Sequence, residues 1–94
     1  MATEQQIQKK ILNYLNSVGC YTIKVISASK SGVPDIVGCY EGVFFGIEVK
    51  TPSTIGNVSK LQEYNIDQIR ISGGHSIVAA DVETVEDFIS GIFL

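Results

Sequence analysis

The sequence is poor in several features that would mark a secreted, membrane or nucleic-acid-binding protein. Cys20 and Cys39 are its only cysteines; two thiols are too few for a disulfide scaffold, and they match no metal-ligand or redox spacing. No run of about 18 apolar residues occurs, so no membrane span is expected. The first segment, MATEQQIQKK, is polar, which argues against a secretory signal.

Basic residues are also scarce. Seven Lys and Arg stand against ten Asp and Glu, for a formal charge of −3. A basic stripe is the usual footprint of a nucleic-acid-binding protein, so the charge argues mildly against that class. A metal-dependent enzyme stays open, because bound divalent cations add positive charge where a substrate sits.

The apolar content, by contrast, is high enough for a packed core. It reaches 45% in 94 residues, which argues against disorder and predicts one domain over residues 1–94. Thr3 and Gln6 form a capping-box pattern at the start of a first helix. An apolar stripe at helical spacing follows, formed by Ile7, Ile11, Leu15 and Val18, and Gly19 supplies the stop.

The remaining elements alternate between strand and helix. Residues 20–27, 34–40, 43–50 and 75–80 read as strands. A second helix is expected from a Ser59 cap, with Gln62 three positions later, to about residue 71. A short C-terminal amphipathic helix is marked by Val85, Phe88, Ile89, Ile92 and Phe93. The order α-β-β-β-α-β-α predicts a compact α/β fold with a mixed sheet flanked by helices, the fourth strand parallel to a neighbour.

The stretch GVPDIVGCYEGVFFGIEVKTP, residues 32–52, places charges inside its apolar runs. If Glu41 and Gly42 form a two-residue hairpin turn, Asp35 lies directly opposite Glu48. Lys50 then projects from the same face, because side chains alternate along a strand. The opposite face is apolar throughout and should be the core face. A three-residue loop would shift the register by one and separate the two acids.

Two directly opposed carboxylates repel each other and destabilise a sheet. Lys50 neutralises one charge, and the remaining negative pair suits a hard divalent cation. The alternative is structural: an ordinary Glu48–Lys50 pair at an exposed sheet end, with Asp35 as a turn residue beside Pro34.

Pro34-Asp35 followed by Glu48-Val49-Lys50 resembles the PD-(D/E)XK nuclease signature. The surroundings, GVPDIVG, GVFFGIEVKT and VSKLQEYNIDQIRISGGHSIVA, are similar to the VRR-NUC (virus-type replication–repair nuclease) family in its stand-alone phage form. This resemblance covers nearly the whole chain, from Glu4 to the fourth strand.

The resemblance implies a Mg²⁺ or Mn²⁺ site. Asp35 and Glu48 would bind the metal with the backbone carbonyl of Val49, and Glu4 could reach it directly or through water. An acid in a first helical turn is also favoured by the helix dipole alone, so Glu4 has a second explanation.

It also implies catalytic roles for two further side chains. Lys50 would activate or orient the attacking water and stabilise developing phosphate charge, and Gln62 would orient the lysine or the water. Gln62 has a competing explanation, since it could simply complete the capping box of its helix. His75, alone in a turn before a strand, is more simply a surface residue than a catalytic one.

The function implied is phosphodiester hydrolysis by a metal-dependent endodeoxyribonuclease, acting as a homodimer on branched DNA such as Holliday junctions. Lys30 and Lys60 are candidate phosphate contacts. The resemblance also implies a phage-encoded protein that works in the host cytoplasm and does not bind a membrane. The alternative is a non-catalytic module of the same fold that binds nucleic acid or protein.

Overall fold

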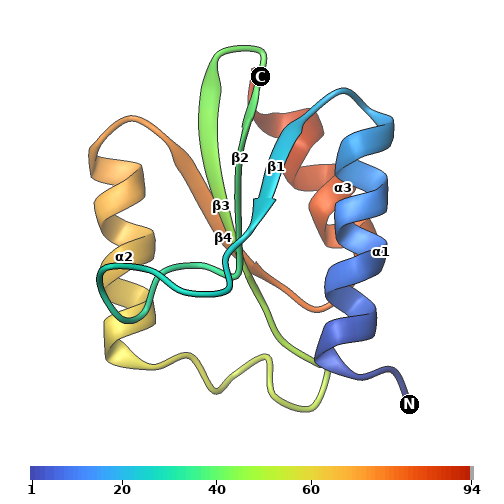
Figure 1. The fold of residues 1–94 in the computed structure, drawn as a ribbon, viewed down its shortest axis with the longest axis vertical. Helices are drawn as coiled ribbons and strands as arrows, with labels where there is room; N and C mark the ends of the chain where they lie inside the picture. The colour runs from blue at the N-terminus through green and yellow to red at the C-terminus, as the bar shows by residue number, and fades with distance from the viewer. Residues whose placement is uncertain (94) are drawn as a thin grey trace.

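The computed structural model describes residues 1–93, so of the predicted domain 1–94 only Leu94 lies outside the described residues. The elements follow the predicted order: α1 (Glu4–Ser17), β1 (Tyr21–Lys24), β2 (Ile36–Tyr40), β3 (Val43–Val49), α2 (Lys60–Ile71), β4 (His75–Ala79) and α3 (Val82–Gly91). Figure 1 shows the sheet between α2 on one side and α1 with α3 on the other. The predicted mixed α/β fold is confirmed.

The sheet has the order β1-β2-β3-β4, with the first three strands antiparallel and β4 parallel to β3. The β2–β3 hairpin turns on two residues in the left-handed region, Glu41 at φ 47° and Gly42 at φ 85°. Such turns match the twist of the flanking strands. Val37 pairs with Gly46, as the two-residue turn requires, so the predicted register is confirmed.

The core lies between the sheet and the α1–α3 layer. Its largest fully buried members are Phe45, Ile11, Leu15, Ile36, Ile47, Val49 and Val85. The face predicted to be apolar is therefore the core face. Gly38 fits there because a Cβ would overlap the Phe45 ring and the β1 backbone.

Two helix predictions need correction at the element ends. The apolar spacing places Val18 on the buried stripe of the first helix, but it is the C-cap of α1 and is 38% exposed. The same spacing places Phe93 in the last helix, but α3 ends at Gly91 and Phe93 is exposed beyond it, with its ring near Tyr40. In both cases the chain leaves the helical path before the apolar spacing ends. None of the helices in residues 1–93 is long and apolar enough to cross a bilayer.

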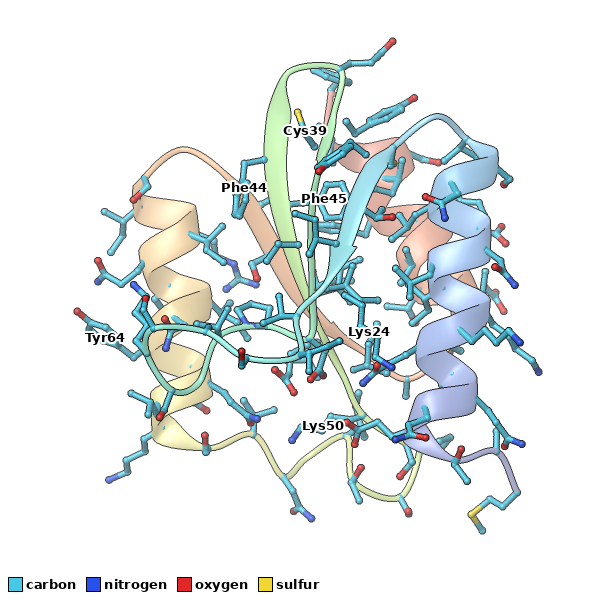
Figure 2. The ribbon with its side chains drawn as sticks, viewed as in Figure 1. Lys24, Cys39, Phe44, Phe45, Lys50 and Tyr64 are labelled. Atoms are coloured by element: carbon cyan, nitrogen blue, oxygen red, sulfur yellow. The ribbon has the colours of Figure 1, made fainter. Side chains whose placement is uncertain are left out.

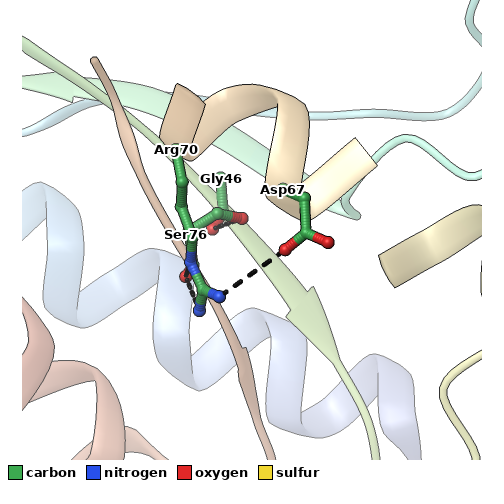
Figure 3. A network of polar contacts seen from close by, with 4 residues as sticks. All are labelled: Gly46, Asp67, Arg70 and Ser76. Atoms are coloured by element: carbon green, nitrogen blue, oxygen red, sulfur yellow. Dashed lines mark hydrogen bonds and ion pairs between the residues drawn. The ribbon is translucent and has the colours of Figure 1, made fainter. Parts of the chain in front are cut away.

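Helix α2 covers the other face of the sheet at its β3–β4 side. Gly46 permits this packing, since a Cβ there would meet Ile69 of α2 at 2.9 Å. Figure 3 shows Arg70 donating from Nε and Nη2 to the carbonyl of Ser76, at 3.1 and 2.8 Å. The Ala79 carbonyl faces β3, so the Ser76 carbonyl, three residues earlier, faces outward. Arg70 thus covers the outer edge of β4.

Candidate functional site

The charged residues of the hairpin meet at one end of the sheet. Asp35 directly precedes β2, Glu48 is the penultimate residue of β3, and Lys50 directly follows it. The carboxyl groups of Asp35 and Glu48 lie within hydrogen-bonding reach of each other, and Lys50 is close enough to act on Glu48 electrostatically. Figure 2 shows Lys50 at the lower end of the sheet. The structure therefore brings these three residues together, as the hairpin register predicts.

Backbone contacts fix the position of Asp35. Its Oδ2 accepts a hydrogen bond from the Val49 N–H at 2.8 Å, and its own carbonyl accepts one from the Val25 N–H at 2.8 Å. The N–H and C=O of one strand residue point to the same side. The Val49 carbonyl therefore faces the Asp35 side of β3.

Glu48 is a buried acid with too little compensation. Its side chain is 4% exposed. Burial raises its pKa to about 8, helped by the hydrogen bond and the negative charge of Asp35, while Lys50 lowers it. The charged form is disfavoured because both desolvation and a like charge oppose it. An exposed Glu–Lys pair, the structural alternative, does not describe this environment.

Gln62 reaches the site from the first turn of α2. Its Nε2 donates to Glu48 Oε2 at 3.3 Å, and its Oε1 accepts from the Ser59 N–H at 3.0 Å. The Ser59 hydroxyl in turn accepts from the Gln62 N–H. The capping explanation and the site explanation of Gln62 are therefore compatible, since the two ends of one amide serve both.

Helix α1 brings one acid near the site and buries a polar side chain one turn later. Glu4 is half-buried, and its negative charge helps to raise the pKa of Glu48. Gln8, one turn later, is 7% exposed, and its Oε1 has no hydrogen-bond partner among the described residues. Gln8 was not among the site residues predicted from the sequence. Its signal was a polar residue on the buried side of α1, four positions after Glu4 and so on the same face.

The remaining predicted residues lie further out. Lys30 borders a groove of about 360 Å³ between α2 and the sheet. Lys60 is exposed at the start of α2. His75 is the first residue of β4 rather than a turn residue, and it is half-buried with its ring near Phe88.

The donor set at the sheet end is small. Within residues 1–93, no three His, Cys, Asp or Glu side chains gather closely enough to hold a metal ion by themselves. A cation here would depend on the two carboxyl groups, the Val49 carbonyl and water. Such all-oxygen ligands suit Mg²⁺, which keeps several of its waters in protein sites.

Comparisons with known proteins agree on the fold. No protein-family model matches the sequence, and no curated protein matches it. Among solved structures, one described as a VRR_NUC domain superposes with a TM-score of 0.78 at 25% sequence identity, covering 96% of this chain and 98% of its own. A VRR_NUC domain protein superposes with a TM-score of 0.73 at 20% identity, covering 98% and 88%. The chain therefore has the VRR-NUC fold, a nuclease-type domain.

Proposed function

We propose that the protein is a metal-dependent endodeoxyribonuclease. The observation that carries this proposal is the pair of carboxyl groups, Asp35 and Glu48, held within hydrogen-bonding reach of each other beside Lys50. A fold gains nothing in stability from a buried acid whose pKa is raised to about 8. Perturbed titratable groups of this kind concentrate at functional sites.

The residues present fit a divalent cation. Asp35, Glu48 and the Val49 carbonyl would hold it, with Glu4 acting through water. Among residues 1–93 the buried Gln8 Oε1 finds no hydrogen-bond donor, and a metal-bound water would supply one. A bound cation would also offset the burial and the negative charge of Asp35 that raise the Glu48 pKa, since an opposite charge favours the carboxylate.

The protein groups around such an ion have separate tasks. The metal, when bound, polarises the phosphoryl group and lowers the pKa of its water. Lys50 places an ammonium where negative charge develops on the phosphate, and helps to orient the attacking water. Gln62 holds the Glu48 carboxyl group through its Nε2, so that this acid keeps one orientation during the reaction.

Branched DNA, for example a four-way junction, is the proposed substrate. With a formal charge of −3, the protein has no excess of basic residues to bind a long duplex. Lys30 and Lys60 would supply phosphate contacts, which carry no sequence information. Recognition by DNA shape needs little more, and two symmetric cuts in a junction match a twofold-symmetric enzyme.

The sheet edges support a homodimer. The outer edge of β4 is covered by Arg70. The other edge strand, β1, exposes Tyr21 and Ile23, and Ile26 just beyond it is 90% exposed. An open apolar edge invites pairing with another chain, so a second copy of the protein at β1 would bury these side chains.

The central experiment is cleavage of a labelled four-way junction with Mg²⁺ or Mn²⁺, and with chelator as the metal-free reference. We expect wild-type protein to cut, and Lys50→Ala to lose activity by about 10²–10³-fold, as for the loss of other groups that stabilise transition-state charge. Lys9→Ala, at an exposed position of α1, is the matched control and should cut like wild type. Equal activity of wild type and Lys50→Ala would contradict the proposal.

Calorimetric titration with Mn²⁺ separates this proposal from a non-catalytic binding module. The proposed site requires heat of Mn²⁺ binding that is lost in Asp35→Asn. A protein that binds the junction, shows no metal site dependent on Asp35 and leaves the DNA intact is a binding module instead. Sedimentation analysis of the same samples tests the dimer, with Ile23→Glu expected to shift it toward monomer.

A further inference from the structure

The segment between β1 and β2 is a loop whose base is closed next to the candidate site. Its first residue, Val25, donates its N–H to the Asp35 carbonyl at 2.8 Å. Residues 26–34 therefore leave and return at one point, and the returning end is Asp35 itself. Short loops of this form, with close ends, are often functional. Figure 1 shows this segment running alongside α2.

The far end of the loop is held by one side chain of α2. Asn65 is 5% exposed, and its Nδ2 donates to the Ser31 carbonyl at 3.2 Å and to the Leu61 carbonyl at 2.9 Å. At Gly32, with φ 81°, an added Cβ would lie 2.7 Å from Leu61 Cγ and 2.9 Å from Asn65 Nδ2. The loop backbone therefore rests directly on the helix, with no room for a side chain.

This contact sets the place of a candidate phosphate-binding lysine. Lys30 directly precedes Ser31 and borders the same groove as Asn65. On α2, Gln62 lies three residues before Asn65, so both project from one face of the helix. One turn of α2 thus holds Glu48 through Gln62 and the Lys30 loop through Asn65.

We propose that Asn65 is a positioning residue for the nuclease reaction: it holds the 26–34 loop so that Lys30 meets a phosphate of the bound DNA. This inference rests on the proposed function. Asn65 does not touch the reacting atoms. It acts through Lys30, so its loss should weaken DNA binding more than it slows the chemical step.

Two variants disturb the contact from opposite sides. Asn65→Leu keeps a side chain with the same branching and number of heavy atoms but removes both donated hydrogen bonds. Gly32→Ala leaves α2 unchanged and forces the loop away from it. Gln68→Leu is the control, because Gln68 borders the same groove one turn later and is exposed. Thermal unfolding by circular dichroism establishes that each variant is folded.

The decisive measurement is a double-mutant cycle with Lys30→Ala. Losing one phosphate contact should raise KM for junction cleavage about tenfold, leave kcat within about twofold, and reduce the salt slope of binding by about one. Asn65→Leu and Gly32→Ala should share this profile. Asn65→Leu combined with Lys30→Ala should be no worse than Lys30→Ala alone, because residues acting through one contact are not additive.

A purely structural role of Asn65 gives a different result. The effects of Asn65→Leu and Lys30→Ala on KM would then multiply in the double variant. In addition, kcat would fall together with stability, and Gln68→Leu would behave like Asn65→Leu. Any one of these results overturns the inference. Amide hydrogen exchange adds a measurement that does not depend on activity. Residues 26–33 should exchange faster in Asn65→Leu and Gly32→Ala than in wild type, and unchanged exchange also overturns the inference. If wild type binds the junction without cutting it, the proposed function fails, and the same cycle run on junction Kd decides the role of Asn65. Absence of junction binding overturns both.

Discussion

Replacing Glu48 with glutamine should make the metal-free protein more stable at neutral pH while removing the proposed metal site. The Glu48 pKa is raised from its ordinary 4.5 to about 8 in the folded protein, chiefly by burial. The folded state therefore binds more protons than the unfolded state between these values. Stability must fall as the pH rises through that window, because it rises only where the unfolded state binds more protons. The side chain in Glu48→Gln would keep the shape of the acid and could still accept from Gln62, without a charge to bury.

The magnitude follows from the two pKa values. At about 1.4 kcal/mol per pKa unit, the interval from 4.5 to 8 corresponds to about 3 kcal/mol between pH 5 and pH 7.5. Wild type and Glu48→Gln should thus have similar free energies of unfolding at pH 5. At pH 7.5 the variant should be more stable by about 3 kcal/mol, a shift in Tm of more than about 10 °C for a domain of this size.

The assay is urea unfolding of metal-free protein at half-unit pH steps, with wild type, Glu48→Gln and Glu86→Gln side by side. Glu86 is exposed on α3, so its replacement controls for loss of a carboxylate in general. Saturating Mn²⁺ at pH 7.5 should stabilise wild type, by about 2.7 kcal/mol at 100 times Kd, and leave Glu48→Gln unchanged. If the curves of wild type and Glu48→Gln run parallel across this pH range, the reasoning about the buried acid pair is refuted.

Further predictions concern the support of the site. Ser59→Ala should lower the free energy of unfolding by about 1 kcal/mol through loss of the α2 cap and keep junction cleavage within about twofold of wild type. Gln62→Ala should lose a similar stability and also at least tenfold in kcat. Equal activities of the two variants would limit the role of Gln62 to capping. Gly38→Ala should destabilise the protein by about 1–3 kcal/mol in urea unfolding, because the added methyl group overpacks the core. Arg70→Ala should uncover the β4 edge and increase concentration-dependent association, measured by light scattering; unchanged scattering would show that the edge is protected in another way.

The parts of the structure set by local rules could be predicted from the sequence. The Glu41-Gly42 pair between alternating apolar runs determined the hairpin turn, and the turn determined the register that places Asp35 opposite Glu48. Both capping boxes, at Thr3 and Ser59, were correct because they depend on residues three positions apart. The helix ends at Val18 and Phe93 were wrong, because apolar spacing continues past the point where the backbone leaves the helix.

Other parts of the candidate site depend on contacts between distant segments. The hydrogen bond from Asn65 to the 26–34 loop joins residues 34 positions apart, and no local sequence pattern predicts it. Gln8 was hidden for a similar reason: only the packing of α1 shows that this polar side chain is buried. The one available signal is spacing, since Glu4 with Gln8, and Gln62 with Asn65, each share a helix face.

The position of Asp35 and Glu48 explains why a cation would relieve the repulsion between them more easily than a movement of the backbone would. Glu48 lies in β3, which is paired on both sides, and its neighbours Ile47 and Val49 are fully buried in the core. The strand cannot shift to move its carboxyl group away from Asp35 without disturbing both ladders and the packing below. Lys50 offsets part of the repulsion, and the rest can be relieved by a proton on Glu48 or by a bound positive charge. A more rigid core should thus hold the two carboxyl groups close together in the metal-free protein. It should therefore also make the protein bind the metal more tightly. Ile47→Val, which loosens this packing, should weaken Mn²⁺ binding in calorimetry although Ile47 is not one of the proposed metal ligands.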